Sequence, residues 1–278
     1  MNLRLDGKVA ALSIKENLKI EFASLARKAC LAIVHFNDPA SASYLKGRLK
    51  IADELGVDVK VIGIEENQNQ EELINIIESL NNDSNVDGIM VDRPLPRRFN
   101  EFEILSLLNP NKDVDGYTPM NLGKLVSNQD CYISCTPGAA IRLVDFYNID
   151  LTGLNALVIG RSVNVGKPLS LLLLNKNATV TVAHSKTKEL KSLCKKADII
   201  FLALGRANFL NKEDVNANTI IVDIGINFTP EGKLCGDANK ECYDLVKAYS
   251  PVPGGVGVMT NVVLMENLLK AYKKNNTL

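Results

Sequence analysis

Apolar runs of strand length alternate with amphipathic segments of helix length along this chain. In the first half, the runs Cys30–Phe36, Val57–Ile64 and Gly88–Val91 predict strands, and residues 42–55 and 70–80 have helical spacing. Apolar residues of the second helical segment recur at i, i+3, i+4 and i+7 and so predict one buried face: Leu73, Ile76, Ile77 and Leu80. This alternation is typical of βαβ units with a parallel sheet.

The second half repeats the pattern more regularly. A polar stretch rich in turn formers, residues 109–119, predicts a long loop near a domain boundary. From about Leu151 onward the chain reads as a compact nucleotide-binding βα series, and residues 261–278 read as one amphipathic helix. The predicted strands and helix of this series are 156–159, 168–175 (the helix), 179–183, 198–203 and 219–224.

Length and charge narrow the functional classes. A chain of 278 residues predicts roughly two domains of about 100–150 residues. With 32 Lys+Arg against 32 Asp+Glu, the protein has no general attraction for nucleic acid or for an anionic membrane. The start has no apolar signal segment, and no stretch approaches the about 18 apolar residues of a membrane span, so we expect a cytoplasmic protein.

Cysteine and histidine usage argue against disulfides and metal. The six cysteines are scattered without a CxxC pair, which predicts reduced thiols rather than a disulfide scaffold. The two histidines, His35 and His184, lie far apart and outside any HExxH pattern, so no metal site is expected.

A glycine-containing turn between a strand and a helix is the first candidate for binding chemistry. In residues 160–168, GRSVNVGKP, glycines allow close backbone approach to a pyrophosphate, and the helix N-terminus favours an anion. The spacing is not GxGxxG, so a tight turn without a ligand is the alternative. After the next strand, Ser185 and Lys186 join Arg161 as candidates to hold a 2′-phosphate, and the absence of an acidic residue there favours NADP over NAD. Lys186 is equally well explained as a surface charge.

Three further segments carry chemistry. The dense Pro/Gly loop Pro251–Gly257 predicts a rigid backbone that a ligand can approach closely. Tyr44 and Arg48, at i and i+4 of a predicted helix, can stack on a flat heterocycle and polarise it, or can simply be a half-buried Tyr and a solvated Arg. Asp113 and Asp115 can grip the N–H edge of a guanidine-like ligand, or can be turn and capping residues.

Several motifs together resemble one family. They are Asp38-Pro39-Ala40-Ser41 with Tyr44, Pro94-Leu95-Pro96, Lys112-Asp113-Val114-Asp115-Gly116, Cys135-Thr136-Pro137, the GRSxxVGxP turn and PVPGGVGxMT. In this order they closely resemble the methylenetetrahydrofolate dehydrogenase/methenyltetrahydrofolate cyclohydrolase family of the FolD type. The resemblance implies an α/β fold: an N-terminal folate-binding catalytic α/β domain (1–140) joined by the C-terminal helix 261–278, and a Rossmann-type, doubly wound parallel-sheet domain (141–260) that binds NADP.

The resemblance also implies an activity. Family members, usually homodimers, oxidise 5,10-methylenetetrahydrofolate with NADP and hydrate the methenyl product towards 10-formyltetrahydrofolate, a one-carbon reaction that serves purine biosynthesis and needs no metal. Tyr44 is then expected to stack near the pterin, Asp115 to grip its N–H edge, and residues Pro253, Gly254 and Gly255 to close the site. NADP is expected along Gly160, Arg161, Ser162, Val165, Gly166, Ser185, Thr187 and Ile226.

Departures from the family pattern fall on the catalytic positions, which here are Tyr44, Arg48 and Asp92. Arg48 stands where the family has a catalytic lysine, and Asp92 where it has that lysine's glutamine partner. Guanidinium, with a pKa above about 12, stays charged and cannot relay protons as a desolvated lysine can. We expect Arg48 and Asp92 to form a bidentate pair. Lys46 and Lys50 point about 160° around the helix from Arg48 and do not replace the lysine.

Other departures are Ser134, Ala139 and Val258, and one residue missing before Asn37-Asp38. The resulting hypothesis is an NADP-dependent dehydrogenase with weakened or lost cyclohydrolase activity, in which Asp92 is the candidate for an alternative proton relay. The alternatives are a non-catalytic folate- or nucleotide-binding relative and an unrelated Rossmann reductase, which the matching motifs disfavour.

Overall fold

The computed structural model describes residues 2–36 and 39–276, except the side chains of 39–41 and 43, so Asp38 of the family-like motif lies outside the described residues. The chain forms two compact units. We name the two units after the ligands that the family resemblance leads us to expect. The nucleotide unit comprises Met1–Leu12 and Thr136–Thr260, and the folate unit comprises Ser13–Cys135 and Asn261–Leu278. Each unit is therefore built from two separate stretches of chain, and the stretch up to Leu12 clusters with the later sheet.

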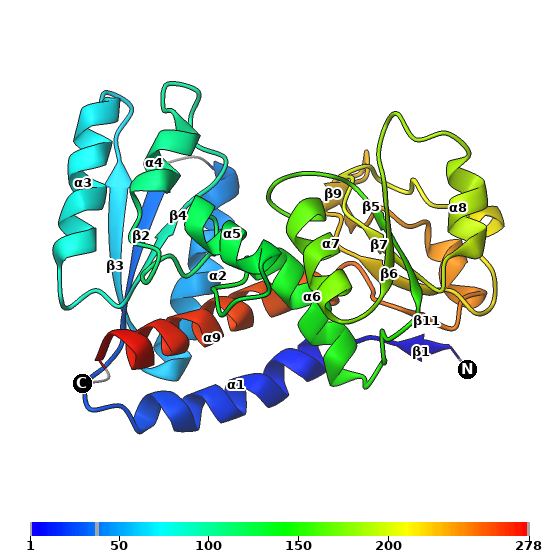
Figure 1. Ribbon diagram of the computed structural model, residues 1–278, viewed down its shortest axis with the longest axis horizontal. Helices are drawn as coiled ribbons and strands as arrows, with labels where there is room; N and C mark the ends of the chain where they lie inside the picture. Colours follow the sequence, from blue (N-terminus) through cyan, green and yellow to red (C-terminus); the bar gives the residue numbers. More distant parts are fainter. Residues whose placement is uncertain (1, 37–38, 277–278) are drawn as a thin grey trace. The chain divides into compact units, whose positions relative to one another are not determined.

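The folate unit contains a three-stranded parallel sheet in the order β3-β2-β4 (Figure 1). Its strands are β2 (Cys30–Phe36), β3 (Asp58–Ile64) and β4 (Gly88–Val91), close to the predicted bounds. The helices of this unit, and those that pass into it from the nucleotide unit, are α1 (Gly7–Ala23), α2 (Pro39–Leu55), α3 (Gln70–Asn82), α4 (Glu101–Leu107), α5 (Pro119–Val126), α6 (Cys135–Phe146) and α9 (Val256–Asn276).

Helices cover both faces of this sheet. In the predicted stripe of α3, Leu73, Ile77 and Leu80 are buried and Ile76 is partly buried. With α4, this stripe packs on the sheet face that carries Val34, Ile89 and Val91. On the opposite face, Gly88 lies so close to α9 that an added Cβ would be 2.8 Å from Leu268 Cδ1. Continuous burial on two faces explains why β2 and β4 read as unbroken apolar runs.

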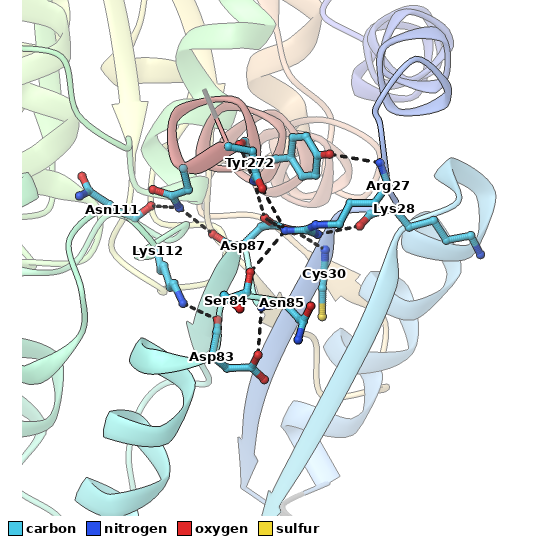
Figure 2. Close-up of polar contacts among 12 residues, drawn as sticks. Arg27, Lys28, Cys30, Asp83, Ser84, Asn85, Asp87, Asn111, Lys112 and Tyr272 are labelled. Carbon is cyan, nitrogen blue, oxygen red and sulfur yellow. Dashed lines mark hydrogen bonds and ion pairs between the residues drawn. The ribbon is translucent and has the colours of Figure 1, made fainter. Parts of the chain in front are cut away.

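A polar network ties the end of α9 to the amino ends of these strands (Figure 2). At its centre is the Asp87 carboxylate, which is 1% exposed. It accepts hydrogen bonds from two guanidinium nitrogens of Arg27 (2.8 and 2.7 Å), from the Cys30 N–H (2.8 Å) and from Asn276 Nδ2 (3.0 Å). The Tyr272 ring lies under the same guanidinium, 5.0 Å from its carbon. Charge pairing and hydrogen bonds thus compensate the burial of this carboxylate.

The nucleotide unit is built on a six-stranded parallel sheet in the order β1-β11-β8-β7-β5-β6 (Figure 1). The chain turns from β5 outward to β6 and then returns to the other side of β5, which makes the end of β5 a topological switch point. Besides α6 and the first turns of α1 and α9, the described remainder of this unit contains a short antiparallel pair, two helices and two 3-10 helices. The elements are β1 (Leu3–Arg4), β5 (Asn155–Ile159), α7 (Gly166–Asn175), β6 (Thr179–Ala183), α8 (Leu190–Lys196), β7 (Ile199–Leu202), η1 (Lys212–Asp214), β8 (Ile220–Asp223), β9 (Asn227–Phe228), β10 (Leu234–Cys235), η2 (Lys240–Asp244) and β11 (Ala248–Tyr249).

All six cysteines are free thiols. Cys30 and Cys131 are half-buried, and the other four are buried. No helix in residues 2–36 or 39–276 is both long and apolar enough to cross a membrane.

Candidate functional site

The carboxyl edge of the folate unit's sheet brings two predicted catalytic residues together. Asp92 follows β4 directly, and its N–H donates to Val34 O of β2 at 2.9 Å. Arg48 reaches this edge from α2, and its Nη1 donates to Asp92 Oδ1. The Asp92 side chain is 3% exposed and that of Arg48 is 12% exposed. The predicted Arg48–Asp92 ion pair is therefore present and shielded from solvent, but it is made through Nη1 and Oδ1 and is not the predicted bidentate pair.

His35 is a member of this cluster that the sequence analysis did not assign. Its Nδ1 lies 2.6 Å from Asp92 Oδ2, the oxygen that a bidentate pair with Arg48 would use. The His35 side chain is buried, near the end of β2. One carboxylate thus bridges a guanidinium and an imidazole. The available signal was the position of His35 at the end of a strand predicted to lie in the same parallel sheet as the strand before Asp92.

Arg93, the neighbouring charged residue, has partners of its own. It donates through Nε to Glu101 Oε1 at 3.0 Å, and its guanidinium carbon lies 4.0 Å from the centre of the Tyr117 ring. The two adjacent charges, Asp92 and Arg93, therefore belong to separate ion pairs rather than to one another.

Tyr44 lies one turn before Arg48 on α2 and is 51% exposed. An aromatic ring presented to solvent beside a partly buried cation has an open face for a flat ligand. Lys46 and Lys50 are exposed, whereas Arg48 is not, as the helical spacing predicts.

The two carboxylates of the KDVDG loop have different surroundings. Asp113 accepts hydrogen bonds from the N–H groups of Tyr117 (3.2 Å) and Thr118 (2.7 Å) and from Asn121 Nδ2 (2.8 Å), so it organises the turn that leads into α5. Asp115 accepts a hydrogen bond from the Cys135 N–H at 3.3 Å. The turn-forming explanation thus applies to Asp113.

Burial dominates the electrostatics of Asp115. It raises the pKa of this carboxyl from 3.8 to about 6, although the bonds from Cys135 and the charge of Arg48 act in the opposite direction. Burial next to Asp115 likewise raises the pKa of the Cys135 thiol well above its ordinary value. The loop is held from α9, where Asn267 Nδ2 donates to Val114 O at 2.8 Å. A carboxyl in this setting gains from a ligand that brings N–H donors to it.

In the nucleotide unit, the glycine turn lies at the switch point. Gly160 has a φ of +136°, and an added Cβ would meet Ala203 O at 2.3 Å. A Cβ on Gly166 would meet Gly160 O at 2.2 Å. The tightness of the turn itself therefore requires both glycines, independently of a ligand.

Ser162 fills part of the predicted anion site. Its Oγ accepts from the N–H groups of Val165 (3.1 Å) and Gly166 (3.5 Å), so the start of α7 is less open than its sequence indicates. Because a hydroxyl both accepts and donates, Ser162 can keep these bonds and donate its own hydrogen to a phosphate oxygen. The turn fits a dinucleotide phosphate in this way.

The other predicted cofactor residues also follow strand ends at this edge. Arg161 and Ser185 are exposed, and they follow the adjacent strands β5 and β6, where Gly160 N donates to Ala183 O at 2.9 Å. Thr187 Oγ1 accepts from the His184 N–H at 2.8 Å and shapes the turn after β6. Ile226, beyond β8, is 45% exposed. Neighbouring strand ends thus present a basic and a hydroxyl side chain suited to a 2′-phosphate.

The Pro/Gly loop is packed against the first residues of the chain, within the same unit. Gly7 N donates to Gly254 O at 2.8 Å, and a Cβ on Gly7 would lie 2.0 Å from Gly255 O. Gly254 has a φ of +105°, and a Cβ on Gly255 would lie 2.6 Å from Pro251 O. Backbone packing thus explains why this loop, which includes Pro253, is dense in glycine.

A parallel sheet with a tight glycine turn at its switch point defines the class of Rossmann-type dinucleotide-binding proteins, here with a second α/β unit that carries a buried cluster of charged and ionisable side chains. Comparison with known proteins narrows this class. Two family profiles match the chain: "Tetrahydrofolate dehydrogenase/cyclohydrolase, catalytic domain" over residues 5–115, and the "NAD(P)-binding domain" of the same family over residues 134–276.

Relatives match over nearly the full length. The "Bifunctional protein FolD" of Thermodesulfovibrio yellowstonii is 45% identical over 274 residues, which cover 97% of this chain and 96% of that protein. A crystal structure of the bifunctional enzyme FolD-methylenetetrahydrofolate dehydrogenase/cyclohydrolase from Campylobacter jejuni matches with a TM-score of 0.96 at 39% identity, over 99% of both chains. The Trypanosoma brucei enzyme, crystallised with NADP cofactor and inhibitor, matches with a TM-score of 0.92 at 28% identity, over 98% of each chain. The chain belongs to the tetrahydrofolate dehydrogenase/cyclohydrolase family.

Proposed function

We propose that this protein oxidises 5,10-methylenetetrahydrofolate with NADP as the hydride acceptor, and that its hydrolysis of the methenyl product is weakened or lost. Family membership supports the first activity, and the buried Arg48–Asp92 pair carries the second part of the proposal. Tyr44 and Asp115 bind the pterin, by stacking and through the carboxyl.

NADP, when bound, accepts the hydride. Ser162 donates to a phosphate at the start of α7, with Gly160, Val165 and Gly166 forming the turn around it. Arg161 and Ser185 hold the 2′-phosphate, and Thr187 supports the turn after β6 that carries Ser185. Ile226 offers an apolar surface to the cofactor. This arrangement favours NADP over NAD because cationic and hydroxyl groups, and no acidic side chain, follow β5 and β6.

The two reactions make different demands on Arg48. Hydride transfer requires that the reacting carbon be positioned, and a fixed guanidinium beside the pterin serves that purpose. Hydration of the methenyl carbon requires a group that takes a proton from water and returns one to the departing nitrogen. Arg48 cannot do this, and Asp92 is already held by Arg48 and His35. These two contacts disfavour Asp92 as an alternative proton relay.

Parallel assays on purified protein test the proposal. NADPH formation from methylenetetrahydrofolate measures the dehydrogenase, with NAD run alongside, and decay of the methenyl absorbance measures hydrolysis. We expect NADPH formation, with hydrolysis near the buffer rate. The double variant Arg48→Lys with Asp92→Gln should raise hydrolysis by about 100-fold, the low end of what a positioned proton-transfer group supplies.

Lys46→Gln, an exposed change on the same helix, is the matched control and should alter neither rate. If the unaltered protein hydrolyses the methenyl compound well above the buffer rate, the proposed weakening of the cyclohydrolase activity is refuted. Absence of NADPH formation would instead favour a non-catalytic, ligand-binding member of the family. We also infer a cytoplasmic homodimer from the family membership, and the mass in solution measured by light scattering tests the dimer.

A further inference from the structure

The His35–Asp92 contact joins two adjacent strands at the edge where the folate unit's predicted catalytic residues gather. Val34 and Val91 are register partners in β2 and β4, so the residues that follow them emerge side by side. His35 Nδ1 and Asp92 Oδ2 are 2.6 Å apart, and both side chains are buried. Because a carboxylate paired with a guanidinium only accepts hydrogens, His35 is the donor in this contact.

The hydrogen bond from His35 affects how the Arg48 guanidinium is oriented. The terminal torsion of an aspartate side chain is broad, so a carboxylate held at one oxygen can rotate about its last bond. Arg48 holds Oδ1 from the flexible end of a long side chain on α2. His35 holds Oδ2 from the backbone of a central strand, which is the more rigid of the two supports. The strand thereby fixes the carboxylate, and the carboxylate fixes the guanidinium.

We propose that His35 is a positioning residue of the dehydrogenase site: through Asp92 it fixes where the Arg48 guanidinium is presented to the folate. It acts without touching the substrate itself. The assignment rests on the proposed function. A positioning role of this kind affects the turnover step more than it affects cofactor binding, because misplacing a group by about 1 Å can cost about 100-fold in rate.

Two amide substitutions separate this role from simple filling of space. An asparagine side chain places its N–H₂ close to the position of Nδ1, whereas a glutamine places it close to Nε2. We expect His35→Asn to retain kcat within about threefold and His35→Gln to lower kcat by roughly 10- to 100-fold. His35→Leu, which fills a similar volume without a donor, should behave like His35→Gln. The KM for NADP should stay unchanged in all three.

A double-mutant cycle shows whether the effect passes through Asp92. In an Asp92→Asn background, His35→Gln should change kcat by less than threefold, because the acceptor of its hydrogen bond is already altered. If His35 had a merely structural role, His35→Gln would lower kcat by the same factor in the unaltered protein and in the Asp92→Asn protein. That result would overturn the assignment. Wild-type kcat in both His35→Gln and His35→Leu would overturn it as well.

Failure of the broader function gives a different result. If the unaltered protein forms no NADPH from methylenetetrahydrofolate, the proposed reaction is wrong, and the role of His35 in it is wrong with it. If the unaltered protein is active and the His35 variants match it, only the positioning role is refuted. Should His35→Leu fail to fold, the Asn and Gln pair still decides between the two outcomes.

Discussion

The buried carboxyl of Asp115 is expected to lower the stability of this protein at neutral pH. Its pKa rises from 3.8 to about 6 on folding, mainly through burial. The ionised form is therefore less favourable in the folded protein than in the unfolded chain. Each pKa step corresponds to about 1.4 kcal/mol, so ionisation of Asp115 costs about 3 kcal/mol of unfolding free energy above pH 6. This cost is absent below about pH 3, where the carboxyl is protonated in both states.

Asp115→Asn tests this magnitude because the amide keeps an oxygen for the Cys135 N–H and carries no charge. The variant should match the unaltered protein at about pH 3 and exceed its stability by up to about 3 kcal/mol at pH 7.5, with the difference growing between about pH 3 and pH 6. Urea unfolding followed by circular dichroism at several pH values measures it. The same variant should lose turnover if Asp115 binds the pterin, which would show that this residue costs stability for the sake of function.

Asp113→Asn is the matched control on the same loop. Asp113 accepts from three N–H groups, and an amide nitrogen would face one or two of these donors. The free energy of unfolding of Asp113→Asn should therefore be about 1–3 kcal/mol lower than that of the unaltered protein at pH 7.5. If Asp115→Asn instead loses stability by an equal amount at pH 3 and at pH 7.5, the reasoning from burial is refuted.

Two further predictions concern stability. Gly166→Ala should lower the free energy of unfolding by at least about 1–3 kcal/mol and raise the KM for NADP, because its Cβ would lie 2.2 Å from Gly160 O. Thermal unfolding measures the change in stability. The control Gly123→Ala, in an open helical position, should be neutral or stabilising. Asp87→Ala should lower the free energy of unfolding by about 3–5 kcal/mol, because Arg27 and the Cys30 N–H lose the carboxylate that accepts from them. The control Asp58→Ala breaks the exposed pair with Lys28 and should change this free energy by less than about 1 kcal/mol. Urea titration measures both variants.

The sheet strands could be predicted because their sequences carry a strong physical signal. β2, β4, β5 and β7 are buried on both faces and read as apolar runs. The two-residue strand β1 is too short to show a period, so its pairing with β11 could not be expected. The sequence of helix α1 has only a weak helical period, because its buried residues Ala10, Leu18 and Phe22 are few and are separated by polar positions.

The candidate site shows a similar division. The Arg48–Asp92 pair could be predicted from the complementary charges and from the family pattern. The partnership of Asp92 with His35 depends on the strand order, which joins positions 57 residues apart, and no local pattern encodes that order. Asp113 and Asp115 have the same side chain two residues apart, and only their three-dimensional surroundings distinguish a turn former from a buried acid.

The return of α9 to the folate unit has a consequence for how the protein is made. A ribosome completes the strands that carry Asp92 and the loop that carries Asp115 long before it reaches Asn261–Asn276, and the whole stretch Thr136–Thr260 is synthesised in between. At about 5–20 residues per second, that interval is on the order of ten seconds. Throughout it, the α9 face of the β3-β2-β4 sheet is uncovered, and Asp87 lacks Asn276. Until the nucleotide unit has been translated, the nascent folate unit therefore exposes apolar surface of the kind that promotes aggregation.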